Sequence, residues 1–198
     1  IATTNRSGAR LGPRAIRNAS MSLAWERPWP WKRDPLEQMA VIDYGDCEGG
    51  LLSVAHMEAH VSTILASGAA SLLLGGDHFI TYPSLCAHAK VHGPISLIHF
   101  DAHTDLLVER LGIDLCFGSW CTHILEFLPA PHHLIQFGIR SSGKPKEHWE
   151  STFGVKQHWA HEIIERGAAA VAADAIAQLK ADNVDEVYVS FDIDALDE

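Results

Sequence analysis

Three residues that can bind metal ions occur at alternate positions in the middle of the chain: Asp101, His103 and Asp105. They follow a short apolar run, residues 95–98, of the kind that forms a buried strand. Side chains two residues apart in an extended chain point to the same side, so we expect the three to converge on one spot. On a helix the middle side chain would point away from the other two. The spacing therefore predicts half of a metal site at the end of a strand.

Two further groups of possible ligands also follow predicted strands. His78 comes after the apolar run 71–74 and two glycines, and Asp192 and Asp194 end the run 186–191. The carboxyl ends of parallel strands meet at one edge of a sheet, where ligands bind. We therefore expect four carboxylates and two imidazoles at that edge, enough for two divalent ions that share aspartates. Oxygen ligands with some imidazole favour manganese over zinc.

Other residues of the same types are assigned no metal. Asp77 and Asp197 are interpreted as turn residues or as supports for the ligands. His56 and His60 lie four apart on one predicted helix, a spacing that can hold zinc. Met57 stands where the metalloprotease pattern requires Glu, so we interpret both as surface histidines.

Predicted strands and helices alternate along the chain. The strands are continuous apolar runs, which is typical of a parallel sheet covered by helices on both faces, an α/β fold. We predict strands at residues 40–46, 71–74, 95–98, 134–139 and 186–191. We predict helices from Pro13 onward and at residues 51–66, 83–91, 119–127, 158–166 and 168–181, with residues 143–150 as a loop that contains a possible short helix.

The composition limits the class of protein. A chain of 198 residues with 47% hydrophobic content can bury a core, so we expect one domain over residues 1–198, truncated at both ends. A net charge of −10 argues against nucleic acid as a partner and fits a cationic ligand or a metal. No apolar stretch approaches the roughly 20 residues that span a membrane. Four cysteines without CxxC spacing are typical of reduced thiols in the cytoplasm.

Three motifs of the chain resemble the signatures of the ureohydrolase family, which contains arginases, agmatinases and guanidinobutyrases. They are Gly-Gly-Asp-His at 75–78, Asp-Ala-His-Thr-Asp at 101–105 and Ser-Phe-Asp-Ile-Asp-Ala-Leu-Asp at 190–197. Residues 10–17 and 43–46 also resemble family segments. The resemblance implies a three-layer α/β/α fold with a mainly parallel sheet and two Mn²⁺ ions.

The resemblance also implies a role for each ligand. One ion would be held by His78, Asp101, Asp105 and Asp192, and the other by Asp101, His103, Asp192 and Asp194. Asp101 and Asp192 would then bridge the ions. A metal-bridging hydroxide would attack the guanidinium carbon of the substrate and release urea and an amine. Asp105 would be the catalytic residue that accepts the proton.

Two positions depart from the family pattern. Leu107 stands where arginases carry an Asn, which disfavours arginase itself. Phe117 stands where a proton-shuttling His is usual, and we interpret the nearby His123 as a histidine on a helix face without that role. Agmatine is therefore the leading substrate, and guanidinobutyrate or guanidine comes next. The acids that bind the guanidinium are expected beyond Glu198.

Other interpretations stay open. The chain could be a homologue that binds metal without turnover, or, more remotely, a zinc deacetylase of related fold. The resemblance also implies a homo-oligomer. The tryptophan-rich loop at residues 25–35 could contribute to a subunit contact, although simple loop packing is the preferred interpretation.

Overall fold

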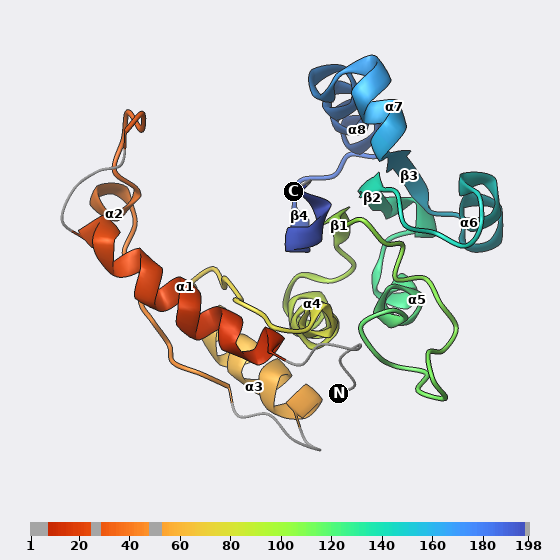
Figure 1. The fold of residues 1–198 in the computed structure, drawn as a ribbon. Coiled ribbons are helices and arrows are strands. Elements are labelled where there is room, and N and C mark those ends of the chain that lie inside the picture. Colours follow the sequence, from red (N-terminus) through yellow and green to blue (C-terminus); the bar gives the residue numbers. More distant parts are fainter. Residues whose placement is uncertain (1–7, 25–28, 48–52, 197–198) are drawn as a thin grey trace.

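A four-stranded parallel sheet lies at the centre of the computed structural model, which describes residues 8–24, 29–47 and 53–196 (Figure 1). The strand order is β3-β2-β1-β4, and neighbouring strands are parallel throughout. The strands are β1 (Ser96–Phe100), β2 (Leu134–Ile139), β3 (Lys156–Trp159) and β4 (Val187–Phe191). All four carboxyl ends therefore meet at one edge.

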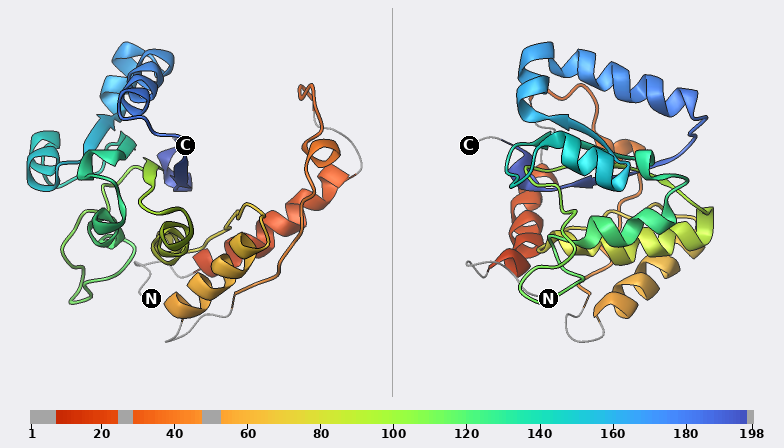
Figure 2. Two further views of the ribbon diagram at one scale, coloured as in Figure 1. Left: turned by 180° about the vertical axis from the view of Figure 1, so that it is seen from behind. Right: turned by 90° about the vertical axis from the view of Figure 1, so that its right-hand side faces the viewer.

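Helices cover both faces of this sheet, which gives three layers (Figures 1 and 2). The helices are α1 (Gly12–Ser20), α2 (Pro35–Gln38), α3 (Ser53–Ala66), α4 (Thr81–His92), α5 (Trp120–Ile124), α6 (Lys146–Phe153), α7 (Ala160–Arg166) and α8 (Ala168–Ala181). Short 3-10 helices are η1 (Ala9–Leu11), η2 (Met21–Ala24), η3 (His78–Ile80), η4 (Leu125–Phe127), η5 (Pro131–His133) and η6 (Ile193–Ala195). The predicted α/β/α fold with a mainly parallel sheet is confirmed.

The alternation of side chains along the strands divides the core in two. Leu97 of β1 faces α4 and α5 in a cluster that includes Leu85 and Ile124. Neighbouring Ile98 points to the other face and packs against the cluster that contains Val171 of α8. The continuous apolar runs of the sequence thus reflect strands buried on two faces.

Two predicted strands are wrong. Residues 40–46 and 71–74 carry no strand hydrogen bonding in the structure, and Ile42 and Leu72 are 83% and 86% exposed. A strand requires a neighbouring backbone as well as an apolar sequence, and neither segment has one among the described residues. β3 was not predicted because its four residues, Lys156–Trp159, are mostly polar. They form a strand because they pair with β2.

The N-terminal segment lies against the loop that leads to His78. A Cβ on Gly12 would come within 2.9 Å of the Gly75 carbonyl oxygen, so this crossing requires a residue without a side chain. Pro13 follows in the first turn of α1, as predicted. The described helices include none that is both long and apolar enough to cross a membrane.

Candidate metal centre

Three segments bring the six predicted ligands to the carboxyl edge of the sheet. His78 begins η3, Asp101 and the residues after it follow β1, and Asp192 and Asp194 follow β4. Backbone hydrogen bonds hold two of these segments to the sheet, from Asp101 N to the Phe137 carbonyl at 3.0 Å and from Asp192 N to the Phe100 carbonyl at 2.9 Å. The site is therefore an extension of the strand pairing.

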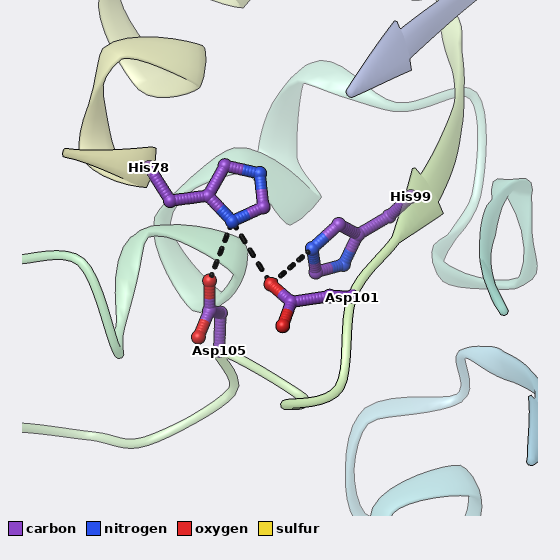
Figure 3. Close-up of side chains that lie close together, drawn as sticks. All are labelled: His78, His99, Asp101 and Asp105. Atoms are coloured by element: carbon purple, nitrogen blue, oxygen red, sulfur yellow. Dashed lines mark hydrogen bonds and ion pairs between the residues drawn. The ribbon is translucent and has the colours of Figure 1, made fainter. Parts of the chain in front are cut away.

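The first group of ligands surrounds the imidazole of His78 (Figure 3). Its Nδ1 atom lies close to three carboxylate oxygens: Asp101 Oδ2 at 2.9 Å, Asp105 Oδ2 at 3.3 Å and Asp192 Oδ2 at 3.2 Å. The side chains of His78, Asp101 and Asp105 are 8%, 1% and 7% exposed. Buried carboxylates this close together repel one another, and a cation or a proton among them relieves the repulsion.

The second group lies on the other side of Asp101. His103 Nδ1 is 3.3 Å from Asp101 Oδ1 and 3.1 Å from Asp194 Oδ2. Asp101 therefore turns one oxygen toward each group. Asp192, by contrast, contacts the first group through Oδ2 while its Oδ1 accepts from the backbone N–H of Asp194 at 3.1 Å.

The spacing of these atoms suits divalent ions. Neighbouring ligand atoms around an octahedral ion with bonds of about 2.1 Å lie about 3 Å apart. The nitrogen–oxygen distances within both groups, 2.9 to 3.3 Å, are of that size. A set dominated by carboxylate oxygens, with imidazole and without thiolate, fits the ligand preference of manganese.

The loop after β1 differs from the expected extended chain. β1 ends at Phe100, and the next residues form bends instead of a strand. Asp105 returns toward His78 because its backbone adopts φ 50°, the left-handed region that Asp tolerates better than most residues. Asp105 thus joins the first group and His103 the second, on opposite sides of Asp101, so the expectation that an extended chain brings all three to one spot was wrong.

Electrostatics reflect this crowding of acids and imidazoles. Burial on its own would lower the pKa of His78, but hydrogen bonds with Asp101, Asp105 and Asp192 outweigh it and raise that pKa well above its ordinary value. Hydrogen bonds with Asp101 and Asp194 raise the pKa of His103 to about 10. Burial raises the pKa of Asp105. Burial acts in the same direction on Asp101, but its three histidine neighbours hold the pKa of that carboxyl far below its usual range.

Several residues that support the ligands were missed at the sequence level. Trp120 Nε1 donates to Asp105 Oδ2 at 2.7 Å, and the indole is fully buried. Arg140 donates to the backbone carbonyls of Asp194 and Leu196 at 2.6 and 3.1 Å, which ties the segment after β4 to β2. Neither contact follows from a local pattern, since each joins distant parts of the sequence.

His99 was also missed, although a signal was available. It lies two residues before Asp101, so the alternation used for the predicted ligands places it on the same side. Its Nε2 atom contacts Asp101 Oδ2 (Figure 3), at 2.9 Å. The side chain of His99 is fully buried.

The predicted ligands line a cavity of about 640 Å³. Leu107 and Phe117, the two departures from the family pattern, lie in its wall with Trp149. Arg110 also lines the cavity, and its guanidinium lies 5.5 Å from the centre of the Phe117 ring. Besides the predicted ligands, the wall therefore combines apolar surface with the guanidinium of Arg110.

The remaining candidates fall outside the ligand groups. The carboxylate of Asp77 caps η3 by accepting from the Phe79 N–H at 2.9 Å, which confirms a turn residue. His123 donates from Nε2 to the Asp114 carbonyl at 2.9 Å. His56 and His60 are exposed on α3, as predicted. Asp197 and residues 25–28 of the tryptophan-rich loop lie outside the described residues.

Comparison with known proteins agrees with the resemblance of the three motifs. The model of the arginase family matches residues 1–198. The chain is 42% identical to the agmatinase of Chromobacterium violaceum over 205 residues, an alignment that covers all of this chain and 60% of that protein. The chain thus spans about three fifths of the curated relatives it matches.

Solved structures show the same relationship. A hypothetical agmatinase from Burkholderia thailandensis superimposes with a TM-score of 0.74 at 43% identity, over 86% of this chain and 54% of that one. Formimidoylglutamase from Bacillus subtilis superimposes with a TM-score of 0.82 at 25% identity, over 98% of this chain and 62% of that one.

Proposed function

Because this chain belongs to the arginase family, we propose that the protein containing it hydrolyses a guanidino compound, with agmatine as the leading substrate, to urea and an amine. The proposal depends most on one observation, the carboxylate of Asp101, whose two oxygens face two separate groups of ligands. That is the arrangement expected of a carboxylate shared by two ions. Residues 1–198 would form part of a single catalytic domain.

Two Mn²⁺ ions would be held by the residues that the motifs predict. His78, Asp101, Asp105 and Asp192 surround one position, and Asp101, His103 and Asp194 surround the other. Asp192 is proposed as the second shared ligand. When bound, such ions lower the pKa of a water molecule and so supply a hydroxide nucleophile near neutral pH.

The chain's own residues would orient the substrate and move its protons. Asp105 is proposed to accept a proton at the carboxylate oxygen that the Trp120 indole does not hold. Leu107, Phe117 and Trp149 offer apolar surface to the methylene chain of the substrate and reduce the access of water. Phe117 carries no ionisable group, so proton transfer to the leaving amine would pass through Asp105 and solvent.

Urea release across a panel of guanidino compounds, with Mn²⁺ added, tests the proposal. We expect turnover of agmatine. If no compound yields urea, the proposed hydrolase activity is wrong. Bound manganese without urea would support the homologue that lacks turnover, and Phe117→His should then restore activity.

A second candidate, guanidinobutyrate, is favoured by Arg110. This cation lines the cavity, where it would attract the carboxylate of guanidinobutyrate and repel the second ammonium of agmatine. The formimidoylglutamase from Bacillus subtilis, which has a similar structure, is also named for an acidic substrate. In the same panel, Arg110→Ala should raise kcat/KM for agmatine relative to guanidinobutyrate by about tenfold, the effect of about 1.4 kcal/mol. An unchanged ratio would exclude Arg110 from substrate choice.

We also propose a cellular location and an oligomeric state for the protein. A cytoplasmic location follows from the cysteine pattern. A homo-oligomer is proposed as well, and Trp29 and Trp31, which are 94% and 49% exposed, are candidates for a subunit contact. Light scattering after size-exclusion chromatography would determine the oligomeric state.

A further inference from the structure

A row of polar side chains crosses the sheet beneath the candidate metal centre. Ser190 of β4, His99 of β1, Gln136 of β2 and Gln157 of β3 occupy the same level, because His99 pairs in register with Ser190 and Gln136, and Gln136 with Gln157. His99, Gln136 and Gln157 are fully buried, and Ser190 is 5% exposed. Four adjacent polar residues in a core are costly unless every donor meets an acceptor.

The hydrogen bonds of this row have a single direction. Trp159 Nε1, which can only donate, lies 2.9 Å from Gln157 Oε1. Gln157 Nε2 therefore points to Gln136 Oε1, at 2.7 Å. Gln136 Nε2 in turn donates to the Thr104 carbonyl at 2.7 Å and to His99 Nδ1 at 2.8 Å. The indole at one end and the carbonyl at the other fix both amide orientations.

The direction of the row determines the state of His99. Its Nδ1 atom accepts from Gln136, so the proton of the neutral imidazole resides on Nε2. That Nε2–H then donates to Asp101 Oδ2 at 2.9 Å. Although His99 lies among the ligands of the first group, a protonated nitrogen cannot bind a metal, so His99 acts as a donor to a ligand.

We propose that Gln136 and Gln157 are positioning residues, which hold His99 in the Nε2–H tautomer and thereby orient the carboxylate of Asp101. The inference rests on the proposed metal centre, because Asp101 is the ligand that both groups share. Direct partners of a ligand, as His99 is of Asp101, typically change metal affinity 10- to 100-fold when they are removed, and Gln136 acts through His99. At the far end of the row, Ser190 Oγ contacts His78 Nε2 at 2.8 Å, so the row reaches two ligands.

Mn²⁺ affinity of the full chain is the first readout, measured by calorimetry. Gln136→Met keeps the length of the side chain but cannot donate to His99, and we expect binding about tenfold weaker, the lower end of the range for direct partners of a ligand. Gln157→Met should weaken binding in the same direction by a smaller factor, because Gln136 then loses only the bond that orients its amide.

Ser96→Ala is the matched control. Ser96 is buried in the same strand as His99, three residues earlier, and its hydroxyl bonds to His133 Nδ1 at 2.7 Å outside the row. The variant should lose stability comparable to that of Gln136→Met while its Mn²⁺ affinity stays within about twofold of the wild type. A general loosening of the core would weaken Mn²⁺ binding in both variants and would overturn the proposal.

The tautomer itself is the second readout. Nitrogen-15 NMR of the metal-free protein should show His99 with a protonated Nε2 and a hydrogen-bonded, unprotonated Nδ1 in the wild type, and a shifted Nδ1 signal in Gln136→Met, where that hydrogen bond is lost. An unchanged Nδ1 signal together with unchanged Mn²⁺ affinity in Gln136→Met would overturn the proposal. If the wild type binds Mn²⁺ normally but releases no urea, the result would instead count against the proposed reaction and leave the proposed role of the polar row unaffected.

Discussion

Asp101 is the residue on which the candidate centre depends most. It is 1% exposed, and its two oxygens contact different groups of ligands. His99 and the backbone N–H of His103 also donate to it, the latter at 2.7 Å. Each oxygen of Asp101 thus accepts one hydrogen bond and keeps a lone pair for the predicted ion on its side. These two bonds fix the orientation of the carboxylate before any metal binds.

Asp101→Asn should abolish the binding of both ions. The amide replaces one carboxylate oxygen by a donor and removes the negative charge that both groups share. We therefore expect Mn²⁺ affinity to fall more than about 100-fold, which exceeds the 10- to 100-fold loss typical when a partner of a ligand is removed. Equilibrium dialysis followed by metal analysis measures this. Asp174→Asn, on α8 beside Arg166 and away from the candidate centre, is the control of equal charge. Unchanged metal content in Asp101→Asn would refute the shared carboxylate.

At the scale of elements, one carboxylate joins three parts of the β3 side of the sheet. Glu162 of α7 accepts from the Trp159 backbone N–H at 2.7 Å, where β3 ends and the helix begins. It also binds Lys146 of α6 at 2.7 Å. Burial opposes ionisation of Glu162, but these two partners outweigh it and lower its pKa. Glu162 therefore caps α7 and holds α6 against it.

Glu162→Gln should lower the free energy of unfolding by about 1 kcal/mol at pH 7, because an amide makes a weaker cap and no ion pair. The carboxyl is more acidic in the folded state, so its stabilisation is present above the unfolded pKa of 4.5 and is lost as pH falls through the folded pKa. Denaturant unfolding across pH 3 to 7 should show the two proteins converging in acid. Glu165→Gln, exposed on the same helix, is the control. A difference that persists in acid would exclude the charge as its cause.

At the scale of the whole molecule, the centre joins segments that are far apart in the sequence. His78, the loop after β1 and the segment after β4 meet at one edge, while β4 itself forms an end of the sheet. Val189 and Phe191 of β4 are 56% and 51% exposed, so apolar packing holds this strand on one face only. Ions bound at the edge would add cross-links to those that Arg140 and Ser190 already make between this side of the sheet and its neighbours.

Mn²⁺ should therefore raise the thermal stability of the whole chain. An ion that binds only the folded state adds about 2.7 kcal/mol at a concentration 100 times its Kd. Thermal unfolding with Mn²⁺ and with a chelator should show a higher Tm in Mn²⁺ for the wild type and no shift for Asp101→Asn. Equal Tm values for the wild type in both conditions would contradict a folded-state metal site.

The sequence by itself determined the parallel sheet and the residues that gather at its edge. Continuous apolar runs followed by Asp or His indicated both, because strands buried on two faces are apolar throughout and parallel strands deliver their ends to one edge. Each of these signals is local. Runs 40–46 and 71–74 carried the same apolar signal and form no strand, since pairing requires a neighbour that a local pattern does not specify.

Only the tertiary structure decided how those residues are held. The left-handed turn at Asp105, the indole of Trp120 on its carboxylate and the split contacts of Asp101 depend on the path of loops. The polar row depends on register, because a shift of one residue between β1 and β2 would turn Gln136 to the opposite face from His99. The identity of a ligand depends on one residue of the sequence, but its orientation depends on partners from other strands.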